Sequence, residues 1–486
     1  MSQQPTPYNQ VDFVVKAPRF RIVFSYMDDK GVAFVREYLL RLLKLIPCKP
    51  EQIAQYFGFN QHETEVALTD LEHNKWITWQ NDGLVTLSAE GLSLFQNSEQ
   101  GSPKIPTLKD HGGEYRMELL DNNFLKQKDC DKVRQQAIEL AIEPKVLSES
   151  QEIARKNFQN RFRQLMENDI IGLNEKDISL YKIDAIETKG APVYFRFTQK
   201  FELLPDTGEA KERHDVPTLI HQDNAQQAVT QQLEQRCHQD NSQELIKNMT
   251  ELDDNDTIKI LFGGKLDLTK FLTIQQEHEQ KNGLYFLGQI YHQEELFKQI
   301  NQFLGNDRLD KKASKKLYWL APSDIYWGKQ RKIHDKIQNL VSEQKNGYEF
   351  RLYLPLPSEN NRHETWEWKN QFKDIPEKSL YGFCEGFLEG STEILFLEDK
   401  FAIVCYHAKL QAYPVTLPIG FMTTQKSEVK HIIALAENYL KSALHLNDDE
   451  PATRDFGSLA RVCSQLLVIT LNKKESRCKK GALTQP

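Results

Sequence analysis

The chain has 486 residues, 39% of them hydrophobic and 27% charged, and a formal net charge of −7 at pH 7. This length predicts about two to four domains, and the negative charge argues against a protein that coats nucleic acid along its whole surface. No apolar run reaches the roughly 18 residues of a membrane span, the first ten residues lack a signal-peptide pattern, and the seven cysteines form no CxxC pair. We therefore expect a cytoplasmic protein with no membrane segment, metal or cofactor.

Residues 1–31 are expected to form an extended N-terminal arm. The stretch VDFVVKAPRFRIVFSY consists of two β-prone runs interrupted at Pro18, and MDDKG then turns the chain.

Residues 32–100 give the clearest pattern. Apolar residues at helical spacing predict a first helix that Pro47 ends. Pro50 favours the start of a second helix, which Gly58 caps, and Asn60 caps a third. Asn-Asp-Gly between ITWQ and LVTLS then predicts a β-hairpin. Three helices and a hairpin form a winged helix-turn-helix.

This stretch, EQIAQYFGFNQHETEVALTDLEHNKWITWQNDGLVTLSAEG, resembles the winged-helix modules of bacterial and archaeal transcription regulators. In a DNA reader the third helix enters the major groove, which makes Gln61, His62 and Thr64 candidate DNA contacts. The module is nevertheless acidic, with five basic against eight acidic side chains between residues 32 and 95. It therefore either binds DNA weakly or docks a protein, and the sequence leaves both open.

Residues 101–215 predict an α+β middle domain or a second winged helix. Residues 101–114 have the glycine and proline content of a linker, 131–147 and 148–169 the pattern of helices, and ISLYKIDAI and APVYFRFTQKFELL that of strands. A polar helical connector is expected over 216–255, which is rich in Gln, Asn and Asp.

Residues 256–445 alternate strand and helix patterns, which predicts an α/β domain with a mixed sheet. The expected strands include TIKILFGG, LYFLGQI, KLYWLAP and YEFRLYLPL, and a hairpin of ILFLE and FAIVCYHA turning at Asp399-Lys400. Residues 446–486 form a tail. The predicted fold class is a multidomain α+β protein.

His407-Ala408-Lys409 matches the HxK signature of phospholipase D-type phosphodiesterases, in which the histidine attacks phosphorus and the lysine holds the phosphate. In that family the lysine is followed by four residues, an Asp, and later Gly-Ser, whereas here Pro414 holds the Asp position. EDKFAIVCYHA instead resembles the later strand, with Cys405-Tyr406 in place of Gly-Ser. The resemblance implies a degenerate phospholipase D-like domain, or, with His407 and Lys409 as catalytic residues, a nuclease that dimerises to complete its site.

Basic clusters are the other candidate sites, because lysine and arginine neutralise phosphates. The predicted nucleic-acid contacts in these clusters are Arg155, Lys156, Arg161, Arg163, Lys311, Lys312, Lys315, Lys316, Arg331 and Lys332.

These features favour a non-enzymatic, bacterial-type nucleic-acid-binding or regulatory protein, whose α/β domain senses a ligand or binds a partner. Its expected partners are double-stranded DNA and other proteins, with homodimerisation as a further expectation. The alternatives are an adaptor subunit of a multiprotein bacterial complex, such as an anti-phage defence system, and a phospholipase D-type nuclease.

Overall fold

The structure is a computed structural model, and it describes residues 5–96, 101–173, 178–205, 207–215, 222–236, 239–261, 264–280, 283–306, 315–342, 348–444 and 453–460. The chain divides into two compact units. The N-terminal unit comprises residues 17–130 and 142–193, and the C-terminal unit comprises 1–16, 131–141 and 194–486. The fold is α+β and includes a mixed eight-stranded sheet, as the sequence predicts.

Within the N-terminal unit, residues 32–95 form the helices and the hairpin that the sequence predicts, in the predicted order. They are α1 (Phe34–Leu45), α2 (Pro50–Phe57), α3 (Gln61–His73), a hairpin of β3 (Ile77–Trp79) and β4 (Val85–Leu87), and α4 (Ala89–Ser93). Gly58 ends α2 with a φ of 70°, and the Asn60 side chain accepts the N–H of Glu63 at the start of α3. Leu39, Leu40 and Leu71 are fully buried in the core between these elements.

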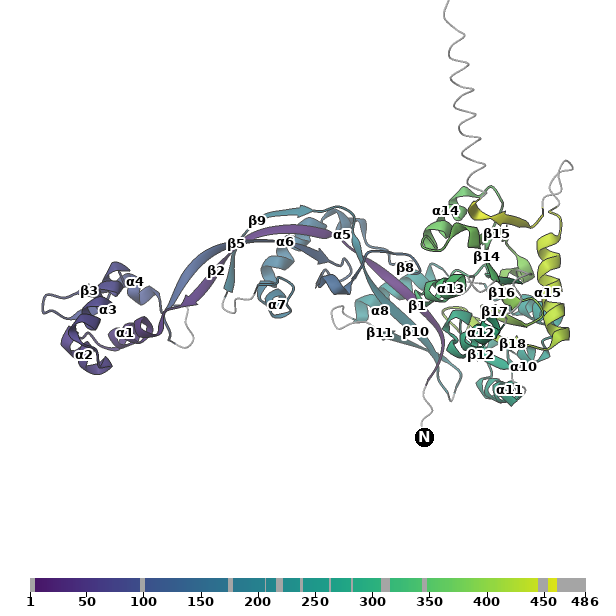
Figure 1. Ribbon diagram of the computed structural model, residues 1–486, viewed down its shortest axis with the longest axis horizontal. Coiled ribbons are helices and arrows are strands. Elements are labelled where there is room, and N and C mark those ends of the chain that lie inside the picture. The colour runs from purple at the N-terminus through teal and green to yellow at the C-terminus, as the bar shows by residue number, and fades with distance from the viewer. Residues whose placement is uncertain are drawn as a thin grey trace, which may run out of the picture. The chain divides into compact units, whose positions relative to one another are not determined.

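A four-stranded sheet forms the rest of this unit. Its order is β6 (Phe124–Leu125), β5 (Lys104–Met117), β2 (Arg19–Gly31) and β9 (Ile178–Thr188), and the helices beside it are α5 (Pro144–Ser148), α6 (Ser150–Asn160) and α7 (Phe162–Glu167) (Figure 1). Phe158 of α6 and Phe162 of α7 pack on Phe24 of β2, with ring centroids 5.1 and 5.5 Å away.

The linker expected over residues 101–114 is wrong, because most of this segment belongs to β5. All thirteen residues of β2 pair with β5, from Arg19 opposite Arg116 to Gly31 opposite Lys104. Its local glycines do not prevent a strand here, since long-range pairing supplies the backbone hydrogen bonds. At Gly113 the small residue has a packing role, because a Cβ there would lie 2.6 Å from the Tyr115 hydroxyl.

The C-terminal unit contains a five-stranded sheet. Its order is β11 (Ala210–Asp215), β10 (Val193–Leu203), β1 (Thr6–Ala17) and β8 (Ile138–Glu139), and β7 (Cys130–Asp131) also pairs with β10. The helix predicted over 131–147 is therefore largely wrong, since only α5 at its end is helical. The carbonyls of Val133, Gln135 and Gln136 bind the Arg196 guanidinium, so they are engaged outside any helix.

Four helices lead from this sheet to the next: α8 (Gln222–Glu234), α9 (Ser242–Glu251), α10 (Asn255–Ile260) and α11 (Leu268–Gln280). The first two lie within residues 216–255, where the sequence predicts helix. The strand expected at TIKILFGG is wrong, because residues 257–260 of this stretch are helical and belong to α10. The Asp254 carboxylate accepts hydrogen bonds from the N–H and the hydroxyl of Thr257, at 3.0 and 2.5 Å, and so caps a helix there.

The eight-stranded sheet is mixed, as predicted. Its order is β12 (Leu284–Leu287), β18 (Leu417–Thr423), β17 (Phe401–Ala408), β16 (Thr392–Leu397), β13 (Lys315–Leu320), β14 (Tyr348–Leu356), β15 (Leu380–Cys384) and β19 (Asp455–Ser458). Strands β13, β14 and β15 are parallel, and the other neighbouring pairs are antiparallel. The predicted hairpin of β16 and β17 is confirmed, with Asp399 at a φ of 60° in its turn.

Helices cover both faces of this sheet. They are α12 (Glu294–Asn306), α13 (Lys332–Ser342), α14 (Arg362–Gln371) and α15 (Lys426–Lys441). Residues of α12 and α13 share a core with Trp319, Leu395 and Cys405 on one face, and α15 lies on the opposite side of the sheet (Figure 1). None of the helices in the described part of the chain has the length and apolarity that crossing a bilayer requires.

Candidate functional site

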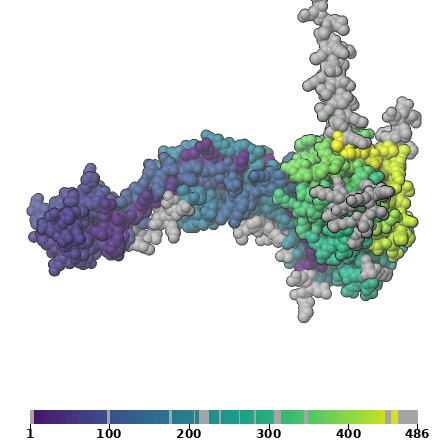
Figure 2. Space-filling model, viewed as in Figure 1, coloured from purple at the N-terminus to yellow at the C-terminus, as the bar shows by residue number. Residues whose placement is uncertain are grey.

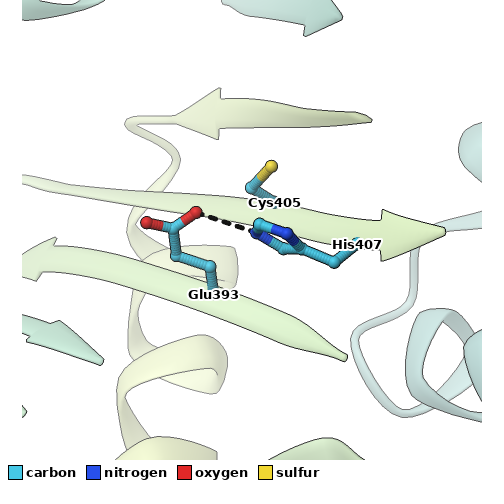
Figure 3. Close-up of side chains that lie close together, drawn as sticks. All are labelled: Glu393, Cys405 and His407. Carbon is cyan, nitrogen blue, oxygen red and sulfur yellow. Dashed lines mark hydrogen bonds and ion pairs between the residues drawn. The ribbon is translucent and has the colours of Figure 1, made fainter. Parts of the chain in front are cut away.

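His407, the residue of the HxK match, lies in β17 and is completely buried. Its Nδ1 is 2.8 Å from Oδ2 of Asp324, and its Nε2 is 3.0 Å from Oε2 of Glu393. Figure 3 shows the imidazole and the Glu393 carboxylate turned toward each other from neighbouring strands. We call Asp324, Glu393 and His407 the histidine cluster.

The two carboxylates of the histidine cluster have further donors. The indole N–H groups of Trp319 and Trp327 donate to Oε1 of Glu393, at 2.6 and 2.7 Å. The Thr416 hydroxyl donates to Oδ2 of Asp324 at 2.8 Å, and the backbone N–H of Tyr326 to Oδ1 at 3.1 Å. Each carboxylate oxygen and each ring nitrogen of the cluster therefore has a hydrogen-bond partner, as buried charges require.

Burial opposes a charged imidazole, but its hydrogen bonds with Asp324, Cys405 and Glu393 outweigh burial and hold the pKa of His407 well above its ordinary value of 6.5. Burial likewise opposes a charged Asp324, yet the hydrogen bond and charge of His407 keep the pKa of that carboxyl below its ordinary value. The raised pKa favours the charged form of the imidazole, which lies between the Asp324 and Glu393 carboxyl groups. In its charged form the imidazole donates from both ring nitrogens and keeps no lone pair with which to attack phosphorus.

Glu393, Cys405 and His407 are also the group of described residues that could hold a metal ion, with their ligand atoms all within 4.8 Å of one another. Burial raises the pKa of the Cys405 thiol to about 11, so this group is a neutral thiol when no metal is bound. Hydrogen bonding within the histidine cluster accounts for the positions of the other two groups. We therefore interpret the cluster as a buried ion network.

The raised pKa of His407 makes this network sensitive to pH. Its contribution to stability is fully present below pH 6.5 and is lost as pH rises through the folded-state pKa, because the unfolded state then releases the proton first. We expect the difference in melting temperature between the wild type and His407→Gln to shrink steadily from neutral to alkaline pH. A difference that stays constant over that range would show that folding does not change the pKa of His407.

Lys409, the second candidate catalytic residue, lies just beyond β17 and is partly exposed. Its backbone N–H donates to Oδ1 of Asn241 at 2.7 Å, and Nδ2 of Asn241 donates in turn to the carbonyl of His407 at 3.1 Å. The end of β17 is therefore fixed by a side chain from the loop before α9.

The predicted nucleic-acid contacts of the N-terminal unit lie along α6 and α7. Lys156 is exposed, and the Arg163 side chain is 92% exposed although its Nε lies 3.2 Å from Oε1 of Glu167. Arg155 pairs weakly with Glu152 at 3.8 Å, and Arg161 donates to Oδ1 of Asn123 at 2.6 Å. Two of these four cations therefore have side chains well exposed to solvent.

The predicted basic contacts of the C-terminal unit are more dispersed. Lys315 and Lys316 are partly exposed at the start of β13, and Lys311 and Lys312 lie outside the described residues. Lys332 is exposed at the start of α13, and Arg331 pairs with Asp131 at 3.3 Å.

On α3, Gln61 and His62 are exposed, and Gln61 donates to Oε1 of Glu65 at 3.1 Å. Thr64 is buried, and its hydroxyl donates to the carbonyl of Asn60 at 2.9 Å. Two of the five basic side chains of this segment are neutralised internally, because Arg36 binds Asp70 at 2.7 Å and Arg41 lies 3.1 Å from Glu37.

The same segment exposes many large apolar side chains, a feature that the sequence pattern did not single out. The exposed apolar set consists of Phe34, Val35, Tyr38, Leu45, Ile46, Tyr56, Val66, Trp79 and Leu92. The side chains of Phe34, Leu45 and Tyr56 are 73%, 84% and 71% exposed. The segment lies among the purple and dark-blue atoms in Figure 2. A concentration of exposed large apolar side chains on a folded protein indicates an interaction site.

Sequence reasoning also missed Asp324 and its two tryptophan neighbours. The string WLAPSDIYW could have indicated them. In it, Asp324 comes just after a predicted strand and lies between Trp319 and Trp327. Comparison of the chain with models of known protein families, with curated proteins and with solved structures finds no match.

Proposed function

We propose that the chain is a non-enzymatic adaptor or regulatory protein that docks a protein partner through residues 32–96. The observation that carries this proposal is the exposed apolar set, which gathers nine large apolar side chains in one small segment. Single exposed apolar residues need no explanation, but a concentration of them does. Tyrosine, tryptophan and phenylalanine, which are enriched at the centres of protein interfaces, supply four of the nine.

Helix α1 is the proposed centre of this surface. Phe34, Tyr38 and Leu45 are spaced four and seven residues apart, so they lie on one face of the helix. The rings of Phe34 and Tyr38 are 4.6 Å apart, whereas Leu39 and Leu43 point into the core. With five basic and eight acidic side chains the segment has a net charge of −3. The partner expected here is a protein with an apolar groove and a basic rim.

The histidine cluster supports the non-enzymatic part of the proposal, because its imidazole is neither exposed nor free to act as a nucleophile. The spacing of the phospholipase D motif also supports the non-enzymatic part of the proposal. If Glu398 or Asp399 stands for the family's Asp, the histidine and lysine positions fall on Ser391 and Glu393, or on Thr392 and Ile394. Neither alignment supplies the histidine and lysine, so a phospholipase D-like domain here would be a degenerate one.

DNA binding is the second candidate function. It is supported by the exposed Lys156 and Arg163 on α6 and α7, and by the resemblance of residues 32–95 to winged helices. The acidic exposed face of α3, with Glu63, Glu65 and Glu72, disfavours the usual major-groove contact.

Replacing Leu45 by aspartate tests the docking surface. The change puts a charge into a proposed apolar contact and leaves the core of α1 intact, so we expect partner affinity to fall about tenfold or more with little change in melting temperature. The matched control is Leu272→Asp on α11, where the wild-type leucine is 39% exposed. The measurement is quantitative affinity capture of the tagged full chain from cells of its source, followed by titration of the purified partner.

Equal capture by Leu45→Asp and wild type would contradict the docking surface. A salt-sensitive affinity for random-sequence duplex DNA that is lost in Arg163→Glu would instead favour the second candidate, because each phosphate contact adds to the salt dependence.

A further inference from the structure

A pocket of about 560 Å³ lies at the carboxyl ends of the parallel strands β13, β14 and β15. Its lining includes Ser323 and Asp324 after β13, Pro355 at the end of β14, and Glu385 after β15. Pockets that hold small molecules have volumes of roughly 300–1,000 Å³, and in open α/β sheets they lie outside the carboxyl ends of the strands. Position and size both suit a small-molecule site.

One wall of the pocket is aromatic. Trp327 follows β13, and Trp366 and Trp368 come from α14. The rings of Trp327 and Trp368 pack 6.0 Å apart at 70°, and Trp368 is fixed further by a hydrogen bond from its indole N–H to the carbonyl of Pro355 at 3.1 Å. Trp366 differs, because it is 58% exposed. An exposed indole beside rigid ones offers a free face on which a planar ring can stack.

A second wall is basic. Arg236, after α8, and Lys329, after β13, both line the pocket, and no ion pair joins either of them to a carboxylate among the described residues. Burial and then the charge of Arg236 lower the pKa of Lys329 to about 8. Nε of Arg236 is buried without a hydrogen-bond partner in the described structure. The charge of Glu367 acts on Lys329 in the opposite sense, but neither cation is paired with a carboxylate among the described residues, and two neighbouring unpaired cations favour an anion.

A third part of the pocket lining is acidic. It consists of Glu364, Glu367 and Glu385. The pKa of the Glu364 carboxyl is raised, first by burial and then by the charges of Glu385 and Glu367. Carboxylates accept hydrogen bonds, so this wall favours a ligand that presents N–H donors. Two further polar atoms of lining residues, the Gln135 Oε1 and the Ser323 hydroxyl, are also buried without a partner in the described part of the chain.

We propose that this pocket binds a nucleotide whose base carries an exocyclic amino group. The base would stack on Trp366, its amino group would donate to the glutamates, and its phosphate would bind Arg236 and Lys329. These three requirements distinguish a nucleotide from an inorganic anion, which uses only the basic wall, and from a neutral aromatic compound, which uses only the indoles. The proposed docking function does not depend on this ligand, and the ligand does not depend on docking.

The test is calorimetric titration of the full chain with AMP and GMP, and in parallel with IMP, adenosine and inorganic phosphate. IMP lacks the amino groups of both AMP and GMP, so it isolates the acidic wall. We expect AMP or GMP to bind, with IMP, adenosine and phosphate each at least about tenfold weaker. Quenching of tryptophan fluorescence should accompany binding and should be reduced in Trp366→Leu.

Variants then locate the site. Arg236→Gln and Lys329→Gln should each weaken nucleotide binding about tenfold or more, whereas Lys430→Gln, which makes the same charge change on the exposed face of α15, should leave it unchanged. The proposal is overturned if none of the nucleotides binds, if phosphate binds as tightly as AMP and GMP, or if the two pocket variants bind like the wild type while folded by circular dichroism.

Discussion

Replacing His407 by alanine is expected to lower the free energy of unfolding by roughly 3–5 kcal/mol, because it removes the cation from between two buried carboxylates. Asp324 and Glu393 would then have to share a buried site with no counter-charge. The measurement is urea unfolding of the full chain followed by tryptophan fluorescence. Trp319 and Trp327 donate to Glu393 and so report on the cluster directly.

The control is His431→Ala on α15, whose wild-type side chain is 43% exposed, and its expected effect is within about 0.5 kcal/mol. A triple replacement, His407→Gln with Asp324→Asn and Glu393→Gln, is expected to recover part of the loss, since it removes the charges together. If His407→Ala and His431→Ala unfold at the same urea concentration, the buried ion network contributes nothing and our interpretation of the cluster is wrong.

Local sequence signals were sufficient to predict the elements whose ends are set by capping or turn residues. Asn60 and Gly58 fix the ends of α3 and α2 by capping, and Asp399-Lys400 gives the turn between β16 and β17. In each case the physical cause acts within a few residues, so it can be predicted from the sequence.

The elements that were wrong or missed depend on distant partners. Strand β5 exists because β2, about 85 residues earlier in the chain, pairs with it over its whole length, which outweighs local glycine and proline content. Most of the segment 131–141 is kept from helix by one guanidinium from β10.

The histidine cluster illustrates the same limit. Its members are 69 and 14 residues apart in sequence, on the loop after β13 and on strands β16 and β17. The period of two along a strand predicts that Cys405 and His407 share a face. It does not predict that Glu393 lies on the neighbouring strand with its carboxylate against the imidazole, since strand order depends on the whole sheet. The HxK match therefore identified His407 but could not predict its two carboxyl partners.

Replacement of Arg196 is expected to have the second large effect on stability. This β10 side chain is 12% exposed, and its guanidinium lies 3.1 Å from Oδ2 of Asp12 and 2.9 Å from Oδ2 of Asp131. The same guanidinium donates to the three backbone carbonyls of the segment 131–141 that are described above. Burial raises the pKa of Asp12 despite a hydrogen bond from Thr198 and the charge of Arg196, so this carboxylate depends on its partners.

Arg196→Ala is therefore expected to destabilise the protein by roughly 3–5 kcal/mol, since Asp12 would be left buried without its cation. Arg196→Lys should recover only part of this, because an ammonium keeps the charge but lacks the planar fork of donors. The matched control is Arg331→Ala. Arg331 lies 3.3 Å from the same Asp131 oxygen but is 59% exposed, and pairs of that kind contribute about 0–1 kcal/mol.

The decisive measurement follows amide exchange and tryptic cleavage within residues 131–141. Lys132 and Arg134 are exposed trypsin sites within the segment that Arg196 holds. We expect amide exchange across residues 131–141 and tryptic cleavage at these two sites to accelerate in Arg196→Ala and to stay at the wild-type rate in Arg331→Ala. Because Gln135 of this segment lines the pocket, nucleotide affinity should fall in the first variant only. Unchanged exchange across 131–141 in Arg196→Ala would mean that the pairing of β8 with β1 alone holds the segment.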